Sequence, residues 1–134
     1  MKKNKGSSDL HGIGRRKGSV ARVWLKPGNG KILINDRDYK KYFDTDISRM
    51  RVEFPMKLTS YNSKYDAFVN VCGGGMIGQS SAVSLGISRA LLVIDENLKK
   101  VLRQNGLLTV DSRVKERKKY GQKGARAKFQ FVKR

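Results

Sequence analysis

The carboxyl-terminal stretch from Asp111 to Arg134 most strongly constrains how this chain can fold. Its 24 residues contain ten lysines and arginines against two acids, Asp111 and Glu116, which gives a net charge of +8. Gly121 and Gly124 interrupt any regular pattern. Such a segment buries too little apolar surface to offset the entropy lost on ordering, so it needs a polyanion to order against. We therefore predict a long extended basic tail.

The aromatic residues of this segment favour RNA as that polyanion. Tyr120, Phe129 and Phe131 are interleaved with the cations, a pattern suited to stacking on bases. Fully stretched, the segment would reach roughly 80 Å, far beyond a small domain. The alternative is a disordered solubilising tail.

Charge is distributed unevenly along the 134 residues, whose net charge is +19. Residues 1–31 carry +8, whereas residues 32–110 carry only +3. This predicts a basic extension (1–11), a globular RNA-binding domain (12–110) and the tail (111–134). A positive excess of this size indicates nucleic acid, with an anionic membrane as the weaker alternative. No apolar run reaches the roughly 18 residues that span a bilayer, so we expect no membrane partner.

The single cysteine and single histidine limit the chemistry available to the chain. Cys72 has no second cysteine to pair with and is expected to be a small buried side chain. His11 is expected to be exposed to solvent or RNA. Zinc would need additional carboxylate ligands, and none cluster in the sequence. We therefore predict no metal, no cofactor and no small-molecule substrate. The start of the chain lacks the apolar segment of a secretory signal, which favours the cytosol or an organelle interior.

Alternation of apolar and polar residues predicts the strands. In Gly14–Leu25, Ala21, Val23 and Leu25 share one face. The glycine- and proline-containing turn that follows predicts a hairpin with residues 31–35, closed by a loop of about five residues. Further strands are predicted over residues 65–72 and 107–110.

Helical spacing predicts the remaining elements. A helix capped by Asp46 carries Ile47, Met50 and Phe54 on one face, and Pro55 predicts a kink or stop. The main helix is predicted over residues 76–94, and a shorter one over 96–104 ending at Asn105-Gly106. A brief helical turn capped by Asn35-Asp36 is expected to run through Tyr42. The order of elements predicts an α/β or α+β fold, a four-stranded sheet with packed helices.

Three glycines open the main helix in a pattern that also occurs in enzymes. Gly73, Gly75 and Gly78 match the G-x-G-x-x-G dinucleotide motif, and Asp95 lies about 20 residues further on. However, the preceding strand alternates, although a central parallel strand should be apolar throughout. The helical stripe also continues where the second strand should lie. We therefore interpret the amides of Gly73–Gly75 as facing an RNA phosphate, and Asp95 as a helix cap.

Several segments together resemble one known family. They are GRRKGSVARV (14–23), PGNGKILIN (27–35), VNVCGGGMIGQSSAVSLGISRALL (69–92), LLTVDSRVKERKKYG (107–121) and the terminal KR. RVKERKKYG combined with a terminal KR is highly specific. From Gly12 to Arg134 the chain is similar to the small-subunit ribosomal protein nine family, in its bacterial or organellar form. After Gly121 the sequence departs from the usual family pattern, with Phe129 where proline is common.

The resemblance implies a fold and a function. The fold would be a four-stranded sheet with packed helices and a left-handed crossover, like the second domain of ribosomal protein five. The function would be structural, not enzymatic, in ribosomes of a bacterial cytoplasm or of a plastid or mitochondrion. The protein would bind small-subunit ribosomal RNA (rRNA) in the head, beside neighbouring head proteins. Its tail would reach the transfer RNA (tRNA) in the peptidyl site.

The resemblance also implies functional residues. The tRNA contacts would be Lys133 and Arg134. The implied rRNA contacts are Arg15, Arg16, Lys17, Lys115, Arg117, Lys118, Lys119, Tyr120 and Arg126. With the remaining cations of the basic segments and the glycine loop, the expected rRNA contacts extend to Arg22, Gly73, Gly74, Gly75, Arg113, Lys123 and Lys128.

Overall fold

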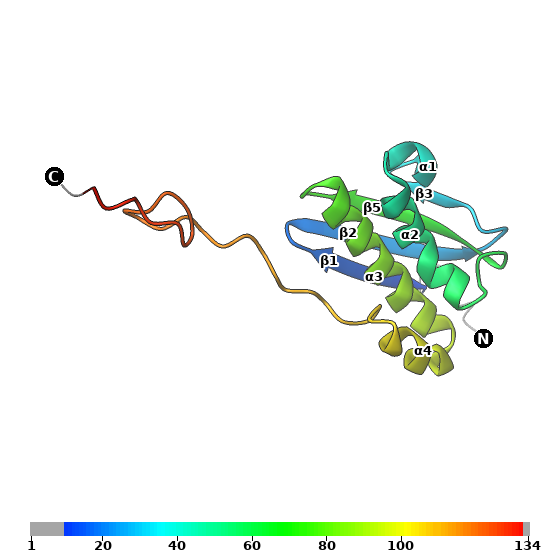
Figure 1. Cartoon of the computed structure of the whole chain (residues 1–134). Helices are drawn as coiled ribbons and strands as arrows, with labels where there is room; N and C mark the ends of the chain where they lie inside the picture. The colour runs from blue at the N-terminus through cyan, green and yellow to red at the C-terminus, as the bar shows by residue number, and fades with distance from the viewer. Residues whose placement is uncertain (1–9, 133–134) are drawn as a thin grey trace, which may run out of the picture.

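The computed structural model describes residues 10–132 and has a mixed α/β fold, in which helices pack on one sheet (Figure 1). This confirms the predicted combination of a sheet and packed helices. The elements in chain order are β1 (His11–Arg16), β2 (Ser19–Pro27), β3 (Ile32–Ile34), β4 (Arg37–Asp38), α1 (Tyr39–Tyr42), α2 (Asp46–Leu58), β5 (Tyr65–Cys72), α3 (Met76–Ile94), the 3₁₀ helix η1 (Glu96–Leu98) and α4 (Lys99–Gln104).

The sheet has five strands, not four, in the order β1-β2-β5-β3-β4. The predicted first strand is a hairpin, in which β1 and β2 pair antiparallel around Lys17-Gly18. The sequence did not predict β1 as a separate strand, because its two core-facing positions, Gly12 and Gly14, carry no side chain and so give no apolar alternation. The predicted strand over residues 107–110 is wrong, since this segment pairs with no strand.

The predicted hairpin between the strand in Gly14–Leu25 and residues 31–35 is also wrong. β2 pairs antiparallel with β5, and β5 pairs in parallel with β3. The Asp66 carboxylate of β5 accepts hydrogen bonds from the backbone amides of Asn29, Gly30 and Lys31, at 2.8–2.9 Å. These bonds tie the loop after β2 to β5, so β5 lies between the two strands expected to form the hairpin.

Two predictions at the starts of helices need correction. Asn35 and Asp36 do not cap α1; both have positive φ and form the tight turn between β3 and β4, a conformation that Asn and Asp tolerate. The cap of α1 is Asp38. Thr45 caps α2 in place of Asp46, through a hydrogen bond from the Ser48 amide.

Helix α2 continues through Pro55, where a kink or stop was predicted. Proline loses one helical hydrogen bond. However, Val52, Pro55 and Met56 are all buried in the core, and this burial favours one continuous helix. Tertiary packing therefore overrides the local preference.

The boundaries of α3 are as predicted, and α3 lies directly on the backbone of β1. A Cβ atom at Gly14 would lie 1.8 Å from the Ala82 carbonyl oxygen, and one at Gly12 would lie 2.2 Å from that of Gly86. By length and composition α3 could cross a membrane, but twelve of its residues are buried in the domain. We therefore interpret α3 as the core helix.

Helix α4 ends directly before Asn105-Gly106, as predicted. Gly106 has φ +70°, and the Leu107 amide donates to the Leu102 carbonyl oxygen at 3.0 Å, which caps the helix. Residues 107–132 contain no helix or strand. In Figure 1 this segment, orange to red, runs away from the sheet.

Candidate nucleic-acid interface

The β1–β2 turn and the glycine loop before α3 lie against each other. The Ser19 hydroxyl donates to the Gly73 carbonyl oxygen at 3.0 Å, and a Cβ at Gly73 would lie 2.4 Å from the Gly18 carbonyl oxygen. Gly18, which follows the exposed Lys17, lies beside Gly74 at the amino-terminal end of α3, where a Cβ at Gly18 would be 3.7 Å from the Gly74 amide nitrogen. This end carries the positive pole of the helix dipole, so the predicted residues meet where a phosphate would be attracted.

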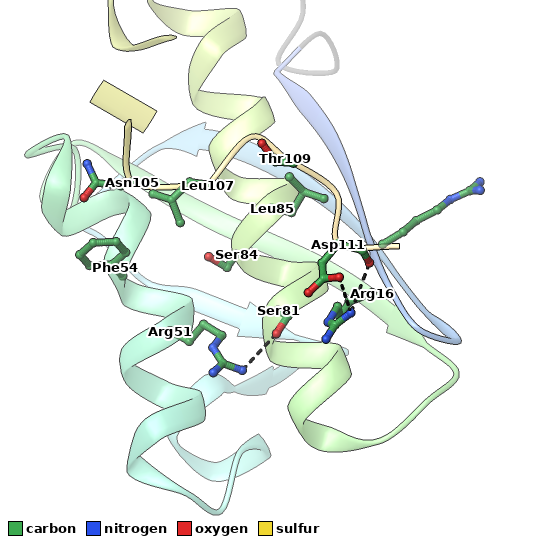
Figure 2. Close-up of a pocket in the computed structure, with 12 residues that line it drawn as sticks. Arg16, Arg51, Phe54, Ser81, Ser84, Leu85, Asn105, Leu107, Thr109 and Asp111 are labelled. Atoms are coloured by element: carbon green, nitrogen blue, oxygen red, sulfur yellow. Dashed lines mark hydrogen bonds and ion pairs between the residues drawn. The ribbon is translucent and has the colours of Figure 1, made fainter. Parts of the chain in front are cut away.

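Arg16 differs from its exposed neighbour Arg15, because its guanidinium is engaged within the protein. Arg16 Nη1 donates to the carbonyl oxygens of Asp111 (3.3 Å) and Arg113 (3.0 Å), and lies 3.2 Å from Asp111 Oδ1 (Figure 2). Hydrogen bonds from Arg113, together with the charges of Arg113 and Arg16, hold the pKa of Asp111 well below its usual range. Arg16 therefore fixes the point at which the tail leaves the body.

A pocket of about 320 Å³ lies beside the point at which the tail leaves the body, between α2 and α3 (Figure 2). Arg51 reaches across it and donates to the Ser81 hydroxyl at 3.1 Å. With Arg16 also lining the pocket, two guanidinium groups make it attractive to anions. Sequence reasoning missed Arg51, because only the packing of α2 on α3 brings it close to Arg16.

The predicted tail cations are exposed to solvent, except Lys119, which is half-buried. The exposed ones are Arg113, Lys115, Arg117, Lys118, Lys123, Arg126 and Lys128. Tyr120 is 100% exposed. A fully exposed aromatic ring among cations can stack on a base.

One short loop is closed within the tail. Glu116 pairs with Lys119 and with Arg126, the latter at 3.0 Å, and the Lys123 amide donates to the Ala127 carbonyl oxygen at 2.9 Å. The pairing lowers the pKa of Glu116. Because Glu116 neutralises part of the charge of Lys119 and Arg126, the unpaired cations around this loop are the stronger candidates for RNA contacts. The two predicted tRNA contacts, Lys133 and Arg134, lie outside the described residues.

The remaining candidate residues give mixed results. Cys72 is exposed, not buried as predicted, because Val71 faces the core and Cys72 alternates with it. His11 is half-buried, with its ring 5.0 Å from that of Trp24. Asp95 caps η1, as predicted, by accepting from the Asn97 amide. Within residues 10–132, no three His, Cys, Asp or Glu residues group as a metal site would require.

The antiparallel pairing of β5 with β2 is incompatible with the all-parallel dinucleotide-binding sheet. The chain instead combines a small α/β body with two strongly basic ends, the charge distribution of a nucleic-acid-binding protein.

Comparisons with known proteins identify the family. The family model described as Ribosomal protein S9/S16 matches residues 14–134. Proteins named small ribosomal subunit protein uS9 are similar along most of their length. That of Cytophaga hutchinsonii is 52% identical over 93% of this chain and 98% of its own. That of Solidesulfovibrio magneticus is 54% identical over 92% of this chain and 95% of its own. That of Borreliella burgdorferi is 53% identical over 92% of this chain and 90% of its own. The chain therefore belongs to this family, whose members are structural components of the ribosome rather than enzymes.

Proposed function

We propose that this protein binds small-subunit rRNA in the head of the subunit, and that its tail contacts the tRNA in the peptidyl site. The observation that carries the proposal is the placement of charge. A body with a net charge of +3 over residues 32–110 is followed by a +8 segment. The described part of that segment is mostly exposed and has no helix or strand. Such a segment gains most by ordering against folded RNA.

In this function the cations neutralise phosphates that folded rRNA crowds together. Phosphate contacts position a protein without reading sequence, and recognition comes from the shape of the RNA. The body supplies Lys17 and the glycine loop, while the tail supplies Lys115, Arg117 and Lys118.

The last two residues would complete the function at the tRNA. Arg134 can offer a planar pair of donors to a phosphate, and Lys133 can add a second positive charge. A phosphate contact is independent of base sequence, as a site that serves every tRNA requires.

The proposal extends to domain organisation and surroundings. Residues 1–11 would form a basic extension, 12–110 the RNA-binding body and 111–134 the tail. Neighbouring proteins of the subunit head would be partners. The bacterial relatives support a bacterial type of ribosome, either in the cytoplasm or within a plastid or mitochondrion.

Deletion of Lys133 and Arg134 tests the proposal. Ribosomes carrying the shortened protein should assemble, but they should hold deacylated tRNA in the peptidyl site about tenfold more weakly, the loss expected for one charge-assisted contact. Filter binding to purified small subunits measures this affinity. The matched control is the double variant Lys99→Ala, Lys100→Ala, which removes the same charge from α4. Parental affinity after the terminal deletion would refute the tRNA contact.

A further inference from the structure

One face of the sheet carries none of the described helices. Figure 1 shows α2 and α3 on the opposite side of the sheet. On that helix side the alternate residues of β2 and β5 are buried, among them Val23 and Val69. The residues between them, including Arg22 and Asn70, are exposed. We call the side of the sheet that carries these exposed residues, away from α2 and α3, the open face.

A row of rings crosses the open face. Trp24 of β2 lies directly opposite His11 of β1 and Phe68 of β5, and Leu33 of β3 follows Phe68. The rings of His11 and Trp24 are 5.0 Å apart. All four side chains are half-buried, so part of each remains accessible. The sheet therefore presents a continuous aromatic and apolar strip.

Cations border this strip. Arg22 is exposed in the adjacent row, opposite Ile13 and Asn70. Lys26 Nζ lies 4.9 Å from the centre of the Phe68 ring. A bound strand that brings a phosphate beside Phe68 would therefore meet an ammonium group already within reach of the ring.

The acids of the open face are bound by backbone amides. Asp66 accepts from three amides of the β2–β3 loop, and Asp38 accepts from the amide of Lys40. Asp66 is therefore held as an anion, with its pKa lowered by the hydrogen bonds from the Lys31 amide and its neighbours. Both carboxylates are directed toward the loop and the helix, so they leave Arg22 and Lys26 available to a ligand.

We propose that the open face binds unpaired RNA bases, which stack on Trp24 and Phe68 while the adjoining phosphates contact Arg22 and Lys26. This inference rests on the proposed rRNA function and adds where, and in what form, the body binds the RNA. Aromatic rings interleaved with cations suit single-stranded RNA, because every base has a π-face and every linkage has a charge. Protein–protein interfaces are depleted of lysine, whereas Lys26 lies over the Phe68 ring here, so RNA is favoured over a protein partner.

The single tryptophan reports occupancy of the face directly. The full-length protein is titrated with a labelled, unstructured RNA oligonucleotide while Trp24 fluorescence and RNA anisotropy are recorded together. The unpaired RNA should quench Trp24 in step with binding. An RNA duplex of equal length should bind through the cations but leave the emission unchanged.

Two variants with matched controls extend the test. Phe68→Leu should weaken binding of unpaired RNA about tenfold, while Ile47→Ala, which truncates an exposed apolar side chain of α2, should have no effect. Arg22→Gln should reduce the salt slope of binding by about one, whereas Arg103→Gln on α4 should not. The quenching of Trp24 in the parent decides the question even if Phe68→Leu folds poorly.

The outcomes separate this inference from the proposed function. RNA binding without quenching would overturn the open-face site and leave the rRNA function standing. No binding to unpaired RNA or to small-subunit rRNA would overturn the rRNA function itself. Quenching that appears only when other head proteins are added would reassign the face to a protein contact and overturn the inference.

Discussion

At the scale of single residues, the packing of α3 on β1 depends on positions that have no side chain. A Cβ at Gly14 would lie 1.8 Å from the Ala82 carbonyl oxygen and 2.6 Å from the Gly86 amide nitrogen. Both are backbone atoms, so neither can move without displacing the helix. We expect Gly14→Ala to lower the free energy of unfolding by about 3 kcal/mol, the upper part of the range for overpacking.

Guanidinium-induced unfolding of the purified protein measures this loss. Gly75→Ala is the control, because a Cβ there meets no atom within 4 Å and should cost less than about 1 kcal/mol at this helix cap. Equal stability of Gly14→Ala and the parent would show that β1 and α3 are not packed this closely.

The side chains at core-facing positions explain why some strands could be predicted from the sequence and others could not. Val69 and Val71 alternate with polar residues, so the sequence correctly predicts the bounds of β5. The core-facing positions of β1 are glycines, whose burial leaves no apolar pattern. The exposure of Cys72 follows from the same alternation, whereas the general tendency of cysteine to be buried predicts the opposite.

At the scale of elements, local patterns predicted helices better than strand pairing. The apolar stripe of α3 lies within a single helix, so the sequence predicts its bounds. Strand order depends on contacts between distant segments, such as Asp66 with the loop at Asn29–Lys31. No local pattern encodes those contacts, so the sequence predicted a hairpin in place of the inserted β5. Likewise, only the burial of Pro55 explains the continuity of α2.

The Asp66 tie between elements predicts a dependence of stability on pH. Hydrogen bonds from the Lys31 amide and its neighbours lower the Asp66 pKa in the folded protein. The carboxylate therefore stabilises the fold above its unfolded pKa of about 3.9. This contribution is lost as the pH falls through the lower folded-state pKa. We expect Asp66→Asn to be less stable than the parent at pH 7, with a difference that shrinks below about pH 4.

Urea unfolding between about pH 2.5 and pH 7, a range that spans the carboxylate titration, measures that difference. Asp44→Asn is the control, since this substitution removes the same charge at an exposed position. A stability difference for Asp66→Asn that stayed constant across the range would show that the charge of Asp66 does not support the loop.

At the scale of the whole molecule, the body and the tail have opposite requirements. The body is nearly neutral between residues 32 and 110 and folds around an apolar core. The tail repels itself and has few apolar contacts, so its order must come from outside. Arg16 joins the two, because its contacts with Asp111 and Arg113 set where the tail begins. A cut beyond Arg113 should therefore separate RNA binding by the tail from folding of the body.

A chain ending at Arg113 tests this division of labour. It keeps the contacts of Arg16 and loses residues 114–134, which hold nine cations and one acid. We expect cooperative unfolding like that of the parent, but weaker binding to small-subunit rRNA and a shallower dependence of affinity on salt. Each lost phosphate contact should reduce the slope of log K against log salt by about 0.7–0.9. Filter binding between 50 and 200 mM salt, the range over which such contacts change affinity by about 10³–10⁵, measures it. Tyr120→Ala keeps every charge and should keep the slope; a truncated chain with the parental slope would mean that the tail does not bind the RNA.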